Sequence, residues 1–264
     1  MAQKSTSTIL SSTTSQPPVE KSKTAIEALA QGGPLLAGIP SFSSLERQRA
    51  HQLEHMAAAF RVVRDPENPH TFWTNPLGRP WSLMRASDMV LVDYDGNTSR
   101  PVNAAGFLIH SALHKARPDV NAACHAHSPY GKAWSTFSRP LEMINQDACI
   151  FYGEAQSVYE QFGGKWLADS LGPKGKAMIL TNHGLLTVGR TVDEAAYLFT
   201  LMERSCQVQL LVEAAAASGI PKHIVGGAEA EYTFRMTSDP DGLYCEFQPD
   251  LEVEDHLCNG DFRN

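Results

Sequence analysis

Two histidines separated by a single residue are the clearest chemical signal in this sequence. His125 and His127 follow a short apolar run, Val120 to Cys124, which is typical of a β-strand. Because side chains alternate between the two faces of a strand, both imidazoles point the same way, roughly 6.5–7 Å apart along it. From that spacing both rings can reach one metal ion at about 2.0–2.1 Å each. The pair therefore predicts part of a metal site.

The third metal ligand must come from another part of the chain, and His183 is the best candidate. It stands in the run Thr-Asn-His-Gly at 181–184, directly after a second apolar stretch, Ala177 to Leu180. Three histidines leave one coordination position of the ion open. A catalytic metal needs such a position and a structural metal avoids it. The three histidines therefore favour an enzyme.

The other histidine pairs and one cysteine have simpler interpretations. His51 and His55 are one helical turn apart, and we interpret them as part of a solvated helix face. His110 and His114 have the same spacing, which can mimic a helical metal site, but no glutamate accompanies them in the HExxH manner. We interpret His110 as a core residue or a support for the metal ligands. Cys124 alternates away from the metal-binding side of its strand and is predicted to pack in the core.

The elements that must position these residues follow from hydrophobic periodicity and turn signals. Ser44 to Phe60 and Thr191 to Ala217 have helical periodicity, and the second begins with a capping box from Thr191 to Glu194. A further helix is predicted over Asn103 to Ala116. Short strands are predicted at Val62–Val63, Thr71–Thr74, Met89–Asp93 and Lys176–Leu180. Short, antiparallel-looking strands between long helices indicate an α/β layered domain.

Composition and charge exclude several classes of protein. The 264 residues are 42% hydrophobic and 19% charged, which suffices for one substantial domain. The formal net charge is -7 and no stripe of Lys or Arg occurs, which argues against nucleic-acid binding. No run approaches the roughly 18 apolar residues of a membrane span. The 5 cysteines are odd in number and form no CxxC pair, which indicates reduced thiols and a cytoplasmic protein.

The chain is predicted to contain three segments. Residues 1–33 are rich in Ser and Thr and are predicted to form a disordered tail. A mitochondrial presequence is the weaker alternative, since the stretch has no Arg and no amphipathic pattern. Residues 34–250 are predicted to form the folded domain, and 251–264 a C-terminal tail.

Several blocks of the sequence resemble the class II aldolase/adducin family. They are NAAGFLIHSA at 103–112, ARPDVNA at 116–122, HAHS at 125–128 and TNHGLL at 181–186, the last followed by Gly189, Thr191, Glu194 and Ala195. The likeness runs from about Pro34 to the region of Phe247, and the blocks lie in the family's order. Within the family, the chain resembles most a fungal branch whose members include decarboxylases of polyketide-derived acids.

This resemblance implies a fold, a metal and an assembly. The fold is an α/β/α three-layer domain around a mostly antiparallel central sheet. The metal is zinc, with manganese or iron as alternatives, and its ligands are His125, His127 and His183. Family members commonly form tetramers with active sites between subunits, so a homo-oligomer that binds a small-molecule substrate is expected.

Two departures from the family pattern bear on the chemistry. In the sugar-phosphate aldolases a glutamate on the helix before the HxH pair serves as acid and base, and the matching position here is Gly106. The stretch near Phe60–Val63 is shorter than in relatives, which carry there a Gly-rich turn that anchors phosphate or carboxylate. A second shortening lies near Gly164–Leu167. Tyr152 is a candidate proton donor from a neighbouring subunit, with packing as the favoured alternative.

The missing glutamate favours one reaction over another. A general acid or base is worth ~10²–10⁴ in rate. Its loss harms an aldolase, which needs both, more than a decarboxylase, which needs only a late protonation. We therefore predict a metal-dependent lyase of secondary metabolism that decarboxylates an aromatic or keto/hydroxy acid. The alternatives are a class II aldolase acting on a hydroxy-carbonyl compound, a non-catalytic adducin-like assembly module, and an iron-dependent oxygenase.

Overall fold

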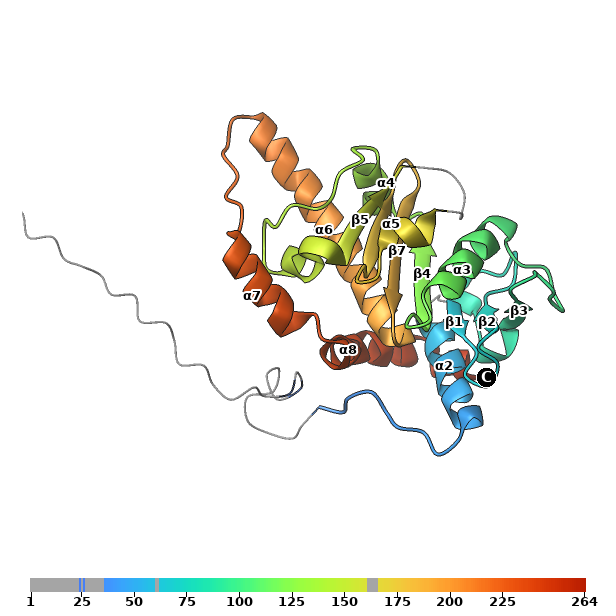
Figure 1. Ribbon diagram of the computed structural model, residues 1–264. Helices are drawn as coiled ribbons and strands as arrows, with labels where there is room; N and C mark the ends of the chain where they lie inside the picture. Colours follow the sequence, from blue (N-terminus) through green and yellow to red (C-terminus); the bar gives the residue numbers. More distant parts are fainter. Residues whose placement is uncertain (1–23, 25, 27–35, 60–61, 161–165) are drawn as a thin grey trace, which may run out of the picture.

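A seven-stranded sheet forms the centre of the structure, a computed structural model that describes residues 24, 26, 36–59, 62–160 and 166–264 (Figure 1). The strand order is β3-β2-β1-β4-β7-β6-β5. The strands are β1 (Val62–Arg64), β2 (Thr71–Thr74), β3 (Val90–Asp93), β4 (Ala122–Ala126), β5 (Gln156–Tyr159), β6 (Ala177–Leu180) and β7 (Gly184–Gly189). Neighbouring strands pair antiparallel except β5 and β6, which are parallel. The sheet is therefore mostly antiparallel, as expected, and the parallel pair of β5 and β6 makes it a mixed sheet.

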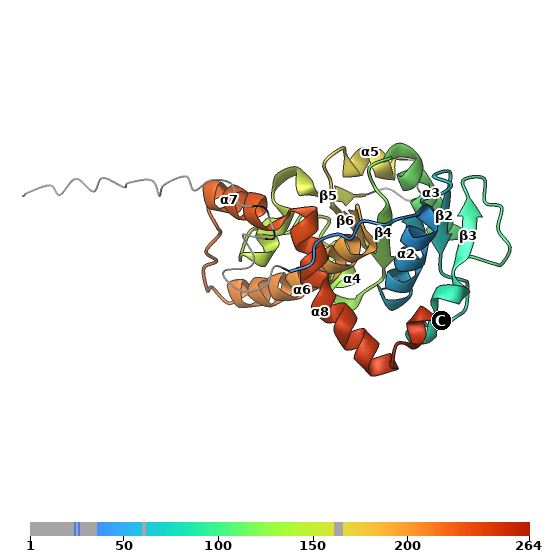
Figure 2. The same cartoon turned by 90° about the horizontal axis from the view of Figure 1, so that it is seen from below.

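Helices cover both faces of the sheet. They are α2 (Leu45–Ala59), α3 (Ala104–Ala116), α4 (Pro129–Ser135), α5 (Leu167–Leu171), α6 (Val192–Ala217), α7 (Gly227–Thr237) and α8 (Pro240–Cys258). On β4, Ala122 lies in a core cluster with Met56 of α2, whereas the next residue, Ala123, lies in a cluster with Leu113 of α3. Figure 2 shows α3 and α5 on one side of the sheet and α6 and α8 on the other. This alternation of buried side chains produces three layers.

The long helix α6 is fastened to the sheet at its first turn. Thr191 Oγ1 accepts a hydrogen bond from the Glu194 N–H at 3.1 Å, as the predicted capping box requires. The Glu194 carboxylate, however, accepts from the Arg190 N–H at 2.6 Å and pairs with Lys176 at 2.7 Å. Half of the capping box is therefore formed, and the other half is replaced by bonds to the ends of β7 and β6.

The C-terminal segment belongs to the folded body. Helix α8 continues unbroken to Cys258, and Phe262 is 3% exposed within the core cluster that contains Met56. The prediction of a tail over 251–264 is therefore wrong, because apolar residues spaced along α8, such as Leu251, bury one face of a charged sequence. The predicted tail at 1–33 lies almost entirely outside the described residues, as do residues 60–61 and 161–165 of the two shortened stretches.

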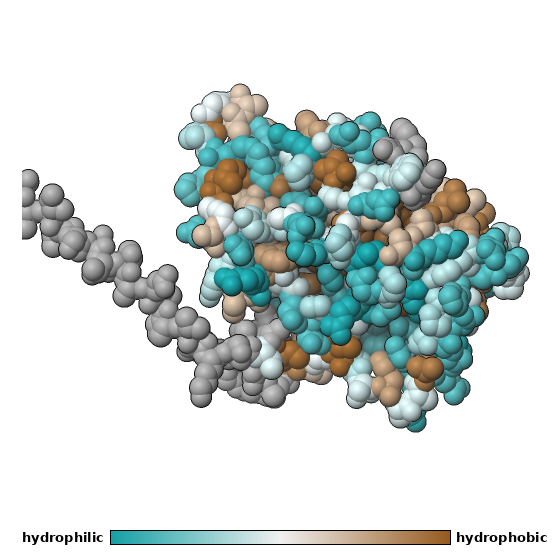
Figure 3. All heavy atoms as spheres, in the orientation of Figure 1, coloured by the Kyte–Doolittle hydropathy of each residue, from teal (hydrophilic) through white to brown (hydrophobic). Residues whose placement is uncertain are grey.

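The surface carries separate apolar patches among polar side chains, as the face in Figure 3 shows. Exposed large apolar residues include Leu108 on α3, Leu211 on α6 and Leu257 on α8. No helix in the described part of the chain combines the length and the apolar character required to cross a membrane.

A fully buried histidine beside the sheet makes the fold sensitive to acid. The His114 ring packs on Phe72 with 5.6 Å between centroids, and its Nδ1 lies 3.2 Å from the Val120 carbonyl oxygen. Burial, and then the nearby Arg64 guanidinium, lower the pKa of His114 to about 3. The folded chain therefore keeps this ring neutral.

We predict that His114→Leu makes the stability of the protein less dependent on pH. The unfolded chain takes up a proton at His114 near its ordinary pKa of about 6.5, whereas the folded chain takes it up only at about 3. The stability from the neutral ring is complete above pH 6.5 and is lost as the pH falls toward 3. In denaturant titrations at several pH values, the slope of unfolding free energy against pH should be shallower by up to about 1.4 kcal/mol per unit in the variant. His256→Gln, on the exposed side of α8, is the control. Equal slopes for wild type and His114→Leu would contradict this account.

Candidate metal centre

The strand β4 presents the two histidines of the HxH pair. It begins and ends two residues later than predicted, so His125 lies inside the strand and His127 just beyond its end. His125 is opposite Leu186 of β7 in the antiparallel register. Since Ala123 faces α3, the alternation of the strand turns both histidines toward α3 as well.

A tight turn between β6 and β7 presents the third histidine. Asn182 has φ +55, in the left-handed region that asparagine tolerates better than most residues. The His183 N–H donates to the Leu180 carbonyl at 2.9 Å and closes the turn. A Cβ atom at Gly184 would lie 2.5 Å from the carbonyl oxygen of Ala126. Glycine at this position therefore lets β7 approach β4 closely enough to bring His183 to the HxH pair.

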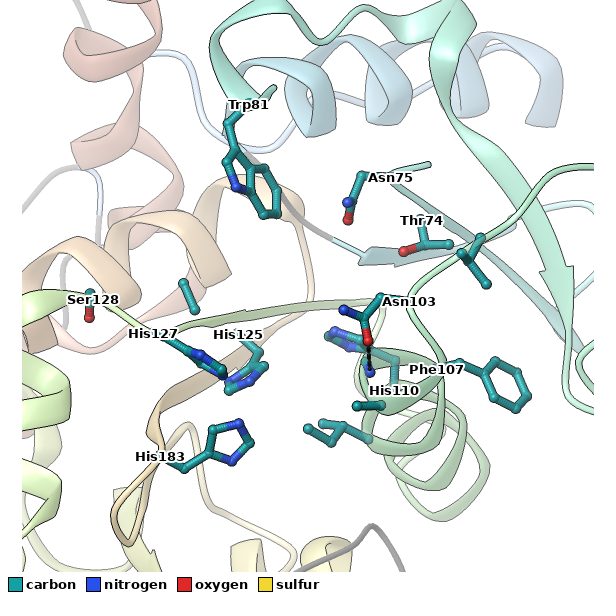
Figure 4. Close-up of a pocket in the computed structure, with 15 residues that line it drawn as sticks. Thr74, Asn75, Trp81, Asn103, Phe107, His110, His125, His127, Ser128 and His183 are labelled. Carbon is teal, nitrogen blue, oxygen red and sulfur yellow. Dashed lines mark hydrogen bonds between the residues drawn. The ribbon is translucent and has the colours of Figure 1, made fainter. Parts of the chain in front are cut away.

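The structure brings the three predicted ligands together. Their ring centroids are 4.8 Å apart for His125 and His183, 4.5 Å for His127 and His183, and 5.2 Å for His125 and His127. One nitrogen from each ring lies within 4.8 Å of the others. Figure 4 shows the three rings converging beside the start of α3.

The protonation of these rings suits a divalent ion. His125 Nδ1–H donates to the Leu185 carbonyl at 2.8 Å, which leaves the Nε2 lone pair of that ring free for a metal. Burial lowers the pKa of His125 to about 4, against the raising effect of this hydrogen bond. Burial and then His127 also lower the pKa of His183. Neutral imidazoles are the form that binds metal, so the donor set fits zinc or a similar ion.

An uncharged pocket of about 520 Å³ opens beside the histidines. Trp81 and Phe107 form part of its apolar wall, and Asn103 and Gly106 border it at the first turn of α3. His110 lines it from the same helix, 6% exposed, and has an Nδ1 atom with no hydrogen-bond partner in the described structure. None of the described lining residues is Asp, Glu, Lys or Arg.

The two remaining residues singled out from the sequence lie in different places. Gly106 is at the pocket, and a Cβ atom there would meet nothing closer than 3.8 Å, so a longer side chain has room. Tyr152 lines another hollow, with Met143 and Ile224, and within one chain it is separate from the histidines. Its predicted role in a neighbouring subunit remains a prediction.

Sequence reasoning missed Glu203 of α6, which holds the turn after the HxH pair. Its carboxylate accepts hydrogen bonds from the Ser128 hydroxyl at 2.5 Å and from the N–H groups of Tyr130 and Gly131 at 2.8 and 2.7 Å. It thereby caps the first turn of α4, where free N–H groups attract a carboxylate. The contact joins residues more than 70 positions apart in sequence. The only local signal for it is the Ser-Pro pair at the start of α4, which is typical of a helix N-terminus with free N–H groups.

The interpretation of His51 and His55 as a solvated helix face is wrong. His55 is 6% exposed, and its Nδ1 lies 2.6 Å from Asp193 Oδ1 at the start of α6. The helix face that carries the two histidines packs against α6 and α8, because the tertiary fold buries a stripe that looks polar in sequence.

Comparisons with known proteins point to one family, which is consistent with the geometry of the histidine cluster. The family described as Class II Aldolase and Adducin N-terminal domain matches residues 51–210. The chain therefore belongs to the class II aldolase/adducin family, as its sequence blocks indicated.

Three similar proteins illustrate the range of this family. The Meiotically up-regulated gene 14 protein of Schizosaccharomyces pombe is 41% identical over 86% of this chain and 97% of its own. Decarboxylase NovR of Streptomyces niveus is 44% identical over 63% of this chain and 64% of its own. Among solved structures, the L-fuculose 1-phosphate aldolase from Glaciozyma antarctica PI12 superposes with a TM-score of 0.80 at 39% identity, covering 86% of this chain and 97% of that chain.

We predict that His183→Gln lowers the metal content of the protein by about one equivalent per chain. The substitution removes one of three ligands and leaves the pair on β4, which binds a divalent ion much more weakly alone. Metal would be counted by inductively coupled plasma mass spectrometry after zinc loading and gel filtration, with His256→Gln as the control. An unchanged zinc content in His183→Gln would show that this turn does not contribute to a metal site.

Proposed function

We propose that this chain is a metal-dependent carbon–carbon lyase, and more specifically a decarboxylase of an aromatic or keto/hydroxy acid. The pocket is the observation that carries the proposal. Three convergent imidazoles line a cavity, and none of the other described lining residues is Asp, Glu, Lys or Arg. A phosphate dianion is usually held by cationic side chains. The uncharged lining therefore favours a substrate without phosphate.

The shape of the lining supports a ring-bearing acid. Trp81, Phe107 and Ile109 contribute apolar surface to the lining of the pocket. The first turn of α3 borders the same pocket, and the partial positive charge of a helix N-terminus, roughly half an elementary charge, suits one carboxylate. An aromatic or keto acid satisfies both surfaces.

The residues of the pocket suit decarboxylation better than aldol cleavage. When bound, a divalent ion supplies a Lewis acid that polarises a carbonyl or hydroxyl oxygen of the substrate. Aldol cleavage also requires a group that takes the hydroxyl proton, and Gly106 provides none. Decarboxylation breaks its carbon–carbon bond without prior proton abstraction, and water in the pocket can supply the late proton. The side chains therefore bind and orient the acid, and the apolar wall limits access of bulk water.

Two comparisons support different members of the lyase class. The name of NovR supports a decarboxylase. The solved L-fuculose 1-phosphate aldolase, which is similar over more of the chain, supports the second candidate, an aldolase whose acid and base come from a neighbouring subunit. The third candidate is an adducin-like assembly module. It is the least favoured, because such a module would have no reason to retain three convergent imidazoles.

We also propose a cytoplasmic homo-oligomer, in which Tyr152 of one subunit lies beside the pocket of the next. The exposed apolar side chains of Leu108 on α3 and Leu211 on α6 support a contact surface.

We expect zinc- or manganese-loaded protein to release CO₂ from at least one member of a panel of aromatic hydroxy acids and keto acids. His183→Gln should abolish the release, since the metal would be lost. A ¹⁴C-carboxyl assay measures this directly, and oxygen consumption measured in parallel detects an iron-dependent oxygenase. No CO₂ from any acid, together with retro-aldol products from hydroxy-carbonyl compounds, would establish the aldolase instead.

We expect Gly106→Glu to raise the KM for the acid substrate at least about tenfold relative to Gly106→Gln, because a carboxylate in this pocket repels an anionic substrate. The two variants have the same size, so their difference isolates the charge. The measurement is steady-state CO₂ release by both variants. Equal KM values would show that the substrate carboxylate does not bind beside α3.

A further inference from the structure

A second group of metal-binding side chains lies on the opposite face of the sheet. It comprises His51 and His55 of α2 and Asp193 of α6. One donor atom from each residue lies within 4.8 Å of the others. We propose that these three residues form a second site for a divalent transition-metal ion. This second site joins α2 to α6 and is independent of the proposed active centre.

The helix geometry gives the two histidines a common direction. Residues at i and i+4 lie one above the other on the same face of a helix. The two rings are in contact, with centroids 3.8 Å apart and planes inclined by 45°. Phe42 and Tyr244 flank them on either side, at 5.0 Å from His51 and 6.5 Å from His55. Aromatic packing therefore restricts the movement of both imidazoles.

Asp193 supplies the oxygen donor. Its Oδ1 lies 2.6 Å from His55 Nδ1, and it also accepts a hydrogen bond from Gln248 Nε2 of α8 at 3.0 Å. Its side chain is 2% exposed. An ion here would take the place of the proton between Nδ1 and Oδ1, and the ring of His55 would carry its proton on Nε2. Two imidazole nitrogens and one carboxylate oxygen are a donor set that zinc accepts.

If His55 and Asp193 formed only a structural hydrogen bond, the unpaired polar atoms of two neighbouring residues would be unexplained. His51 makes no hydrogen bond with the described residues, although its ring is in contact with that of His55 and one of its nitrogens is turned toward the group. Gln52 has a buried Oε1 atom that also has no partner there. Both residues line a cavity of about 320 Å³ at the group. A bound ion uses the His51 nitrogen directly, and a water on the ion can donate to Gln52.

The distances require only a small adjustment. In a tetrahedral zinc site the donor atoms are about 3.3 Å apart, as follows from metal–ligand bonds of about 2.0–2.1 Å. The nitrogen of His51 must therefore move inward by roughly 1.5 Å at most, which a rotation of its side chain provides. The positive end of α6 opposes a cation near Asp193, but this effect is small beside the free energy of metal coordination.

His51→Gln is the informative variant, because it leaves the bond between His55 and Asp193 intact. We expect the wild-type protein to bind two zinc equivalents per chain in a competition titration with a chromophoric chelator, and His51→Gln to bind one. Zinc affinity at the second site should fall at least about 100-fold in the variant, since even residues that only support metal ligands contribute 10–100-fold. The exposed residue His256, changed to Gln, is the control, and circular dichroism verifies the fold of each variant.

The His183→Gln variant separates this proposal from that of the active centre. His183→Gln should retain the zinc equivalent that His51→Gln loses, and the thermal midpoint of His183→Gln should rise on addition of zinc, because the ion stabilises the α2–α6 contact. If His51→Gln binds as much zinc as the wild type, the second site is refuted while the first is unaffected. If wild type binds a single equivalent that only His51→Gln removes, the second site stands and the proposed active centre is refuted.

Discussion

The close pairing of β4 and β7 is the constraint on which the cluster of His125, His127 and His183 depends. His125 and His127 lie at the end of β4, and His183 lies in the turn before β7, more than 50 residues away in sequence. They meet because Gly184 lets the backbone of β7 approach that of β4 closely at Ala126. Any side chain at this position would push the strands apart by more than the tolerance of a metal–ligand bond, which is a few tenths of an ångström. Backbone packing therefore determines the ligand geometry, and the rings themselves adjust only around it.

The layered architecture explains why the pocket opens where it does. β4 is a central strand, so both of its faces are covered, one by α2, α6 and α8 and the other by α3 and α5. Along the side of β4 that faces α3, exposure rises toward the end of the strand: Ala123 is buried, His125 is half-buried and His127 is exposed. A buried strand thus fixes the backbone, while its last residues line the pocket. This arrangement agrees with the general placement of functional residues at strand ends and loops on a rigid scaffold.

The sequence predicted the elements with strong local signals and missed those defined by long-range contacts. The period-two spacing of His125 and His127 and the turn around His183 predicted the cluster, because both signals are local. Strand β7 lacks alternation, since all of its residues are buried. Strand β5 is a short edge strand of four residues without an apolar pattern. The predicted domain boundary at 250 falls inside helix α8, because the charged residues of this helix obscure its apolar stripe. The burial of His55 and the role of Glu203 depend on packing partners that no local pattern identifies.

Helix α6 connects the two histidine groups mechanically. Near its first turn, Asp193 bonds to His55 on α2, and three turns later Glu203 holds the N–H groups that follow His127. Residues 193 and 203 are ten apart, a rotation of about 1,000° at 3.6 residues per turn, which places them some 80° apart around the axis. One helix can therefore contact both α2 and the start of α4 without bending. A shift of α6 along its axis would disturb both carboxylates together, so fixing its first turn against α2 also restrains the turn that orients His127.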